Sequence, residues 1–138
     1  MKILVAEDDM PSRKFLSKFL SDYGDVDMVV DGLESLDAYL ISVKENELYD
    51  LICLDIMMPK VDGIKALKAI KDYEDKKGVE ISKRSKVMMT TALSDTEYVN
   101  EALKLGCTAY AAKPLNIKKM SEVMEKLGFQ KTSHKVAK

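Results

Sequence analysis

The most constraining feature of this sequence is a short apolar run that ends in an aspartate. Leu51 to Leu54 are all apolar, Asp55 follows directly, and the chain soon reaches Pro59. An apolar run of this length between turn residues is typical of a strand buried on both faces, as in a parallel sheet. A carboxylate inside such a strand is costly, but at its carboxyl end it lies where open α/β sheets bind ligands. We therefore expect Asp55 to be a functional residue.

Short apolar segments and amphipathic segments alternate five times along the chain. Residues typical of helix starts precede the amphipathic segments. The expected strands cover residues 2–6, 26–30, 51–55, 87–89 and 108–112, and the expected helices begin near Pro11, Asp31, Ile64, Ser94 and Asn116. This alternation predicts an α/β fold, in which a parallel sheet carries helices on both faces and the crossovers are right-handed.

The sequence also predicts how three less regular parts of the chain behave. The second helix presents apolar residues at helical spacing, which we expect it to bury: Leu33, Leu36, Tyr39, Leu40 and Val43. The highly charged residues 74–86 are expected to form an extended surface loop, which the end of the third helix can enter. Residues 1–128 are expected to form one domain, and residues 129–138 a flexible basic C-terminal tail.

Composition excludes several classes of protein. With 138 residues, 46% of them hydrophobic, the chain has enough apolar material for one core. The net charge of −1 offers no basic field for direct nucleic-acid binding. No apolar run approaches the roughly 20 residues of a membrane span, and the start turns acidic too early for a signal peptide, so we expect a cytoplasmic protein. Cys53, Cys107 and a single histidine make no zinc site, and the thiols are expected to be reduced and packed.

The polar residues that stand out all follow directly after predicted strands. The carboxyl ends of parallel strands share one edge of the sheet, so these side chains should converge. They are Glu7, Asp8 and Asp9 after the first strand, Asp55 at the end of the third, Thr90 and Thr91 after the fourth, and Lys113 after the fifth. Clustered carboxylates raise each other's pKa unless a cation joins them, and Mg²⁺ suits an all-oxygen set of ligands. Asp55 could then act as a nucleophile, and Lys113 could bind the oxygens of a phosphoryl group.

These residues form a pattern known from one protein family. Asp8-Asp9, Asp55-Ile-Met-Met-Pro-Lys-Val-Asp-Gly63, Thr91-Ala92 and Lys113-Pro114 resemble the receiver domain of two-component response regulators, in order and spacing over residues 1–128. The resemblance implies a flavodoxin-like sheet of five parallel strands in the order 2-1-3-4-5, with five helices on both faces. Since several separate motifs carry it, the resemblance is specific.

The resemblance also implies a phosphorylation site. Asp55 would be the phospho-acceptor and Lys113 the phosphate-binding lysine. Asp8 and Asp9 would bind Mg²⁺, with Asp9 binding directly and Asp8 partly through water, and the backbone carbonyl of Met57 would complete the protein ligands. Alone, an Asp-Asp pair before a helix is more often a helix cap than a metal site. The metal-site interpretation therefore depends on all of these motifs occurring together.

The resemblance also implies two residues that change position on phosphorylation and three that shape the backbone of the site. Thr91 would be the switch hydroxyl, chosen over Thr90 because it directly precedes Ala92, and Tyr110 would be an aromatic switch whose ring turns inward. The simpler interpretation of Tyr110 is packing alone. As structural residues, the resemblance implies Pro59 and Gly63 in the loop after the acceptor and Pro114, whose bond to Lys113 is a candidate cis peptide.

The function implied is a signalling switch. A sensor histidine kinase or a phosphotransfer protein would phosphorylate Asp55, and the changed face would bind a downstream effector protein. We expect a stand-alone, chemotaxis-regulator-like receiver, monomeric or transiently dimeric when phosphorylated, and not an enzyme toward an external substrate. The alternative is a Mg²⁺-dependent phosphatase of the haloacid-dehalogenase type. Such enzymes usually carry a second aspartate two residues after the nucleophile, where this chain has Met57.

Overall fold

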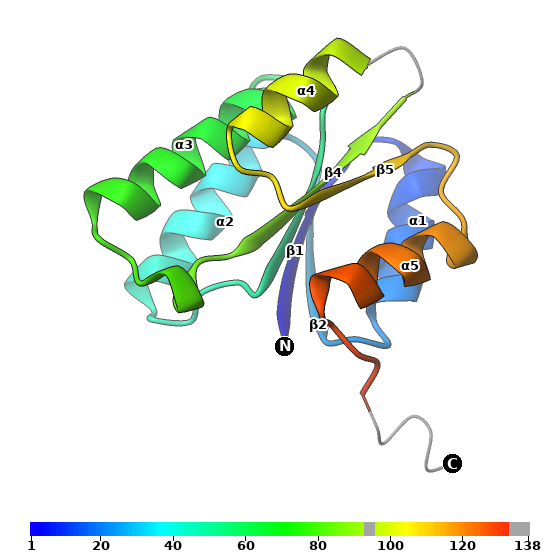
Figure 1. The fold of residues 1–138 in the computed structure, drawn as a ribbon, viewed down its shortest axis with the longest axis horizontal. Coiled ribbons are helices and arrows are strands. Elements are labelled where there is room, and N and C mark those ends of the chain that lie inside the picture. Colours follow the sequence, from blue (N-terminus) through cyan, green and yellow to red (C-terminus); the bar gives the residue numbers. More distant parts are fainter. Residues whose placement is uncertain (93–95, 133–138) are drawn as a thin grey trace.

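Five parallel strands form a single sheet with helices packed on both of its faces (Figure 1). The computed structural model describes residues 1–92 and 96–132, so the helix start expected at Ser94 lies outside the described residues. The strands are β1 (Lys2–Ala6), β2 (Asp25–Val29), β3 (Leu51–Asp55), β4 (Lys86–Thr91) and β5 (Ala109–Ala112). Their order, β2-β1-β3-β4-β5, confirms the flavodoxin-like prediction.

Each strand is followed by a helix, as the alternation in the sequence predicts. The helices are α1 (Met10–Leu20), α2 (Gly32–Lys44), α3 (Gly63–Lys76), α4 (Thr96–Lys104) and α5 (Ile117–Leu127), with a 3₁₀ turn η1 (Ile81–Lys83) before β4. Asp31 and Asn116 cap α2 and α5 with their side chains, as expected. Gly128 ends α5 with a φ of 85°, a backbone conformation that glycine adopts at little cost.

The sheet divides the core into two layers. Helices α1 and α5 cover one face, while α2, α3 and α4 cover the other (Figure 1). Side chains of β3 alternate between these layers: Leu51 and Cys53 face α1 and α5, and Ile52 and Leu54 face the other helices. All five residues of β3 are buried, which confirms a strand covered on both faces. Cys53 and Cys107 are both buried free thiols, as predicted.

Helix α2 buries only part of the apolar face predicted for it: Leu36 and Val43 pack against the core, as expected. Leu33 and Leu40 are 46% and 42% exposed, whereas Tyr39 is buried as expected. The face toward the sheet includes Ser35 and Ser42, whose hydroxyls donate hydrogen bonds to backbone carbonyls of their own helix. Because these bonds satisfy the hydroxyls, small polar residues can occupy the core side of this helix.

The charged segment 74–86 is only partly a surface loop. Helix α3 continues to Lys76, so Glu74 lies in the helix, where it is buried. Its carboxylate accepts a hydrogen bond from the Ser85 amide at 3.1 Å and lies 3.4 Å from the Lys71 ammonium. The Ser85 hydroxyl donates to the Tyr49 carbonyl at 2.6 Å. Glu74 therefore ties the end of α3 to the start of β4.

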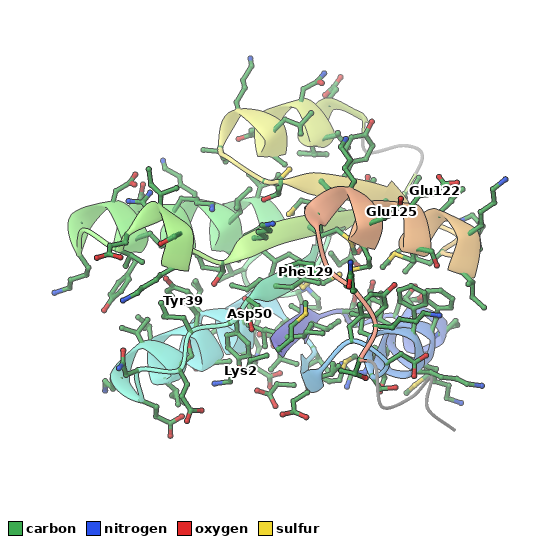
Figure 2. The ribbon with its side chains drawn as sticks, turned by 60° about the horizontal axis from the view of Figure 1, so that its bottom comes forward. Lys2, Tyr39, Asp50, Glu122, Glu125 and Phe129 are labelled. Carbon is green, nitrogen blue, oxygen red and sulfur yellow. The ribbon has the colours of Figure 1, made fainter. Side chains whose placement is uncertain are left out.

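The first residues after α5 are docked on the domain. Phe129 packs against the core layer of α1 and α5, with the Lys86 ammonium 5.1 Å from its ring centroid (Figure 2). The amide and hydroxyl of Thr132 both donate to the Asp22 carbonyl, at 2.8 and 3.0 Å. Phe129 and Thr132 therefore contact the folded domain, whereas a flexible tail from residue 129 onward stays a prediction, and residues 133–138 lie outside the described residues.

No helix in the described part of the chain combines the length and apolar character needed to cross a membrane.

Candidate functional site

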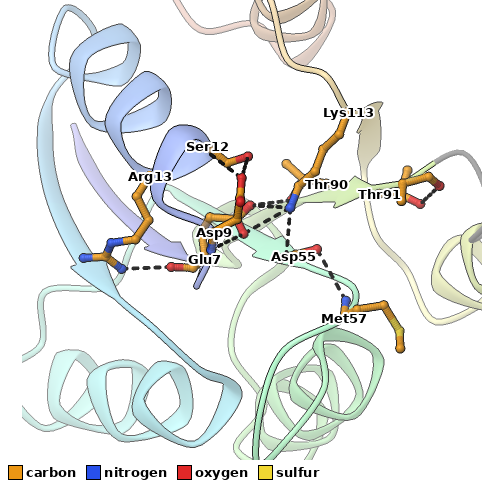
Figure 3. Close-up of polar contacts among 10 residues, drawn as sticks. Glu7, Asp9, Ser12, Arg13, Asp55, Met57, Thr90, Thr91 and Lys113 are labelled. Carbon is orange, nitrogen blue, oxygen red and sulfur yellow. Dashed lines mark hydrogen bonds and ion pairs between the residues drawn. The ribbon is translucent and has the colours of Figure 1, made fainter.

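Polar side chains from four strand ends meet at the carboxyl edge of the sheet. Glu7 follows β1, Asp55 ends β3, Thr90 lies in β4 and Lys113 follows β5 (Figure 3). The Lys113 ammonium lies 3.0 Å from Asp55 Oδ2 and 3.0 Å from Glu7 Oε1. One lysine therefore pairs with two carboxylates, and Asp55 and Lys113 come together as the sequence predicts.

The two carboxylates beside Lys113 are almost entirely removed from water. Glu7 is fully buried and Asp55 is 5% exposed. Burial, with the neighbouring Asp55 carboxylate, raises the pKa of Glu7 to about 7. Burial alone would lower the pKa of Lys113, but hydrogen bonds and attraction to Asp55 and Glu7 outweigh it, so the pKa is raised. Lys113 is therefore a cation at neutral pH and offsets part of the negative charge.

The acidic residues after β1 have three separate environments. Asp9 caps α1, and its carboxylate accepts hydrogen bonds from the Ser12 amide at 3.2 Å and the Ser12 hydroxyl at 2.7 Å. These bonds lower the pKa of Asp9. Glu7 points into the buried cluster, and Asp8 is exposed. Carboxylate oxygens of Glu7, Asp8 and Asp55 lie within 4.8 Å of one another.

The acidic residues that lie beside Asp55 are Glu7 and Asp8. The resemblance implies Asp8 and Asp9 instead. The helix cap holds Asp9 on Ser12, and Glu7 takes the inward position beside Asp55. A signal for Glu7 was present in the sequence. Side chains alternate along a strand, so Glu7 continues the face of Ile3 and Val5, which point toward α1 and α5.

The donor set fits a hard divalent cation. All three grouped side chains offer carboxylate oxygens, which Mg²⁺ prefers, and one lysine leaves their negative charge only partly balanced. The Met57 amide lies 3.4 Å from Asp55 Oδ1, so the chain turns back toward the carboxylate directly after the strand (Figure 3). The Met57 side chain itself is 54% exposed.

The loop after Asp55 packs tightly against its surroundings. A Cβ atom on Gly63 would lie 2.2 Å from the Asp55 carbonyl oxygen, and the Gly63 amide donates to the Ile56 carbonyl at 2.8 Å. Only glycine fits there. Pro59 precedes Lys60, which has a φ of 66°. The Lys113-Pro114 bond is cis, as the sequence analysis expects.

The two adjacent threonines of β4 face opposite sides of the sheet. Thr90 Oγ1 lies 3.5 Å from Glu7 Oε1, so Thr90 faces the buried cluster. The Thr91 hydroxyl donates to the Ala92 carbonyl at 3.0 Å and lies away from Asp55 in Figure 3. Tyr110 pairs in register with Met89, two residues before Thr91, and is 48% exposed. The sequence predicts both threonines at this edge, and in the structure Thr90 is the one that lies beside Glu7.

A concavity of about 660 Å³ opens beside Lys113. Helix α1 and the segment after β5 form most of its walls, and most of its lining side chains are apolar. They are Asp9, Pro11, Ser12, Phe15, Ala92, Lys113, Pro114 and Leu115. The buried acidic cluster thus borders a largely apolar concavity.

Comparison with known proteins assigns this arrangement to one family. The model of the response regulator receiver domain matches residues 3–125. The chain is 36% identical over 123 residues to the chemotaxis protein CheY of Treponema pallidum (strain Nichols), which is 88% of this chain and 78% of that protein. It is 34% identical to the hybrid signal transduction histidine kinase I of Dictyostelium discoideum, of which it spans only 7%.

Solved structures show the same fold with bound partners. The co-crystal structure of the Saccharomyces cerevisiae phosphotransfer protein Ypd1 and the receiver domain of Ssk1 matches with a TM-score of 0.75 and 27% identity, over 91% of this chain and 87% of that chain. The complex of CheX, CheY, BeF3 and Mg²⁺ from Borrelia burgdorferi matches with a TM-score of 0.74 and 26% identity, over 91% and 87%. Fold, site and sequence agree, and the chain belongs to the response regulator receiver domain family.

Proposed function

We propose that this chain is a phosphorylation-dependent switch that accepts a phosphoryl group on Asp55 from a histidine kinase or a phosphotransfer protein. The observation that carries the proposal is the convergence of Asp55, the carboxylates of Glu7 and Asp8, and the Lys113 ammonium at one edge of the sheet. Receiver domains are typically signalling modules rather than enzymes with external substrates.

In the transfer step an Asp55 carboxylate oxygen attacks the phosphorus of a phosphohistidine. A P–O bond to Asp55 forms as the P–N bond breaks, and the donor imidazole leaves with the electron pair and takes up a proton. The Lys113 ammonium, 3.0 Å from Asp55 Oδ2, is placed to bind the phosphoryl oxygens where negative charge gathers.

Glu7, Asp8 and Asp55 are the residues that would hold Mg²⁺, together with the backbone carbonyl of Met57. When bound, the cation offsets the charge of the carboxylates and of the incoming phosphoryl group. This assignment replaces Asp9 with Glu7, because the Asp9 carboxylate is engaged by Ser12. Asp9 keeps a structural role as the cap of α1.

The phosphoryl donor would dock on the apolar concavity between α1 and the segment that follows β5. Phe15, Lys113 and Leu115 line this concavity, and the Lys113 ammonium lies 3.0 Å from Asp55 Oδ2, so a donor docked there would lie close to the acceptor. Support comes from the Ssk1 receiver domain, which crystallises with the phosphotransfer protein Ypd1. Apolar contact would exclude water while the phosphoryl group moves.

Phosphorylation would then change the opposite side of the site. Thr91 would turn its hydroxyl toward the phosphoryl group, and the half-exposed Tyr110 ring would move inward. Leu103 of α4 is also exposed, so the apolar surface of the face formed by α4, β5 and α5 would change when Tyr110 moves. A downstream effector protein, or a second copy in a transient dimer, would bind this face in one state only.

The experiment that tests the proposal is intact-mass measurement after incubation with acetyl phosphate. Wild type should gain one phosphoryl group with Mg²⁺ and none without it. The Asp55→Asn variant should gain none, because an amide is a poor nucleophile. A Glu7→Gln variant should need more Mg²⁺ than wild type, whereas Asp9→Asn, which keeps a capping side chain, should not.

Normal labelling of Asp55→Asn would contradict the acceptor assignment. A need for extra Mg²⁺ in Asp9→Asn but not in Glu7→Gln would return the metal site to Asp8 and Asp9. Steady consumption of acetyl phosphate without any labelled protein would favour a phosphatase instead of a switch.

A further inference from the structure

Arg13 joins the ends of two strands beside the acidic cluster. Its Nη1 donates to the Glu7 carbonyl at 2.8 Å (Figure 3). The same Nη1 donates to the Val29 carbonyl at 2.9 Å. The Val29 carbonyl also accepts the Glu7 amide at 3.1 Å. Glu7 is the first residue after β1 and Val29 is the last of β2, so Arg13 holds the point at which the chain leaves the sheet.

The chain has little room to position its acidic residues after that point. Only three residues, Glu7 to Asp9, separate β1 from α1. The Asp9 amide donates to Glu7 Oε2 at 3.1 Å, and the Arg13 amide donates to the Asp9 carbonyl at 2.9 Å. Together with the Arg13 side chain, these bonds hold the backbone of the turn at Glu7 and at Asp9. Asp8 lies between the held points with its side chain exposed.

Arg13 acts on the backbone and not on the acidic charges. Among the residues that the structure describes, it forms no ion pair with a carboxylate, and its guanidinium bonds only to peptide carbonyls. A charged donor makes strong bonds to carbonyl oxygens, and a planar guanidinium fixes their direction better than a flexible ammonium. The bond to Glu7 is therefore suited to fix the geometry of the peptide that carries a buried carboxylate.

We propose that Arg13 is a positioning residue for the acidic triad of Glu7, Asp8 and Asp55. By fixing the Glu7 peptide, it holds the Glu7 and Asp8 carboxylates in the arrangement that binds the divalent cation before the cation arrives. This inference rests on the proposed function, since it assigns Arg13 to the same metal site. It predicts that Arg13 contributes to Mg²⁺ affinity although its own charge repels Mg²⁺.

The test is a comparison of Arg13→Met with Lys14→Met. Lys14 is the exposed neighbour of Arg13 on α1, so the two variants lose the same charge in nearly the same place. Mg²⁺ affinity is measured by calorimetric titration, without any phosphodonor. Loss of charge alone tightens Mg²⁺ binding slightly. Loss of positioning weakens it, by about tenfold if Arg13 acts as outer partners of metal ligands commonly do.

The expected result is weaker binding in Arg13→Met and unchanged or slightly tighter binding in Lys14→Met. Amide NMR signals of Glu7 and Asp8 should also shift in metal-free Arg13→Met but not in Lys14→Met. Equal Mg²⁺ affinities in the two variants would overturn the inference, even if Arg13→Met is less stable, because a purely stabilising residue leaves the affinity of the folded protein unchanged. If Arg13→Met does not fold, Arg13→Lys is compared with wild type, because it keeps the charge but loses the planar guanidinium. Weaker Mg²⁺ binding supports the inference, and unchanged binding overturns it.

The outcomes separate this inference from the proposed function. Wild type that neither binds Mg²⁺ nor accepts a phosphoryl group contradicts both. Wild type that does both, with an Arg13→Met variant whose affinity equals that of Lys14→Met, contradicts only the role of Arg13.

Discussion

At the scale of single residues, Glu7 carries a carboxyl group whose charge is costly in this fold. Its carboxyl group is fully buried, and its neighbours are an ammonium, a second carboxylate and a threonine hydroxyl. Burial and the Asp55 carboxylate raise the pKa of Glu7 to about 7 from an ordinary value of 4.5. In the metal-free protein, Glu7 therefore holds a proton over a pH range in which the unfolded chain has lost it.

This raised pKa predicts a pH-dependent stability. Between pH 4.5 and about 7 the folded state binds more protons than the unfolded state, so the free energy of unfolding should fall as pH rises through this window. Glu7→Gln removes the titration but keeps the size of the side chain. At pH values above about 7 the variant should be more stable than metal-free wild type, by about 3 kcal/mol.

Urea unfolding in the presence of EDTA, repeated across this pH range, measures the difference. The two proteins share all their other titrating groups, so the difference isolates Glu7. A difference that stays constant from pH 4.5 upward would show that the Glu7 carboxyl titrates at its ordinary pKa in the folded protein.

At the scale of elements, the start of α2 supports the loop that follows Asp55. A Cβ atom on Gly32 would lie 1.8 Å from the Val61 carbonyl oxygen, so the loop backbone rests directly on this glycine. Asp31, the cap of α2, accepts from the Glu34 amide and lies 3.6 Å from the Lys60 ammonium. Helix α2, which contributes no side chain to the acidic cluster, thus helps to hold the loop that carries Met57.

Gly32→Ala should therefore displace this loop and destabilise the protein. The contact is with a backbone atom, so relief requires the loop itself to shift rather than one side chain to rotate, and overpacking of this kind costs about 2–3 kcal/mol. The expected signs are a lower midpoint of urea unfolding and shifted amide NMR signals in the loop from Met57 to Asp62.

Gly78→Ala is the matched control. Nothing lies within 4 Å of its added Cβ, and its φ of 63° adds only backbone strain. That strain costs about 1 kcal/mol and leaves the loop signals in place. Equal losses of stability in the two variants, with unshifted loop signals in Gly32→Ala, would argue against a supporting contact at Gly32.

At the scale of the whole molecule, the last described residues return to the first part of the chain. Thr132 bonds to the carbonyl of Asp22, between α1 and β2, and Phe129 packs on the layer formed by α1 and α5. The Lys86 ammonium also donates to the Leu127 carbonyl. These contacts join α5 to elements distant in sequence.

A chain that ends at Gly128 should therefore be less stable than one that ends at Thr132. It loses the partly buried Phe129 ring and two hydrogen bonds to Asp22, which together amount to about 1–3 kcal/mol. The midpoints of urea unfolding of the two truncated proteins provide the measurement. Equal midpoints would place the end of the domain at residue 128, as the sequence analysis expects.

The sequence by itself predicts much of this molecule. The apolar run before Asp55 identifies a strand buried on both faces, and the alternation of strands and helices predicts the parallel sheet, because both signals depend on local periodicity. The convergence of Asp55 and Lys113 follows from the parallel sheet, since residues at strand ends share one edge whatever their distance in sequence.

Only the tertiary structure decides which of several similar residues, close together in sequence, enters the site or the core. Glu7 and Asp9 are both acidic, so the sequence does not distinguish which of them lies with Asp8 and Asp55. In the structure a helix cap holds the Asp9 carboxylate on Ser12, and Glu7 joins Asp8. Likewise, α2 carries apolar residues on more than one side, and its packing against the sheet leaves Leu33 and Leu40 in solvent. Periodicity predicts that a helix or strand forms, but its rotation and its contacts are set by the elements packed around it.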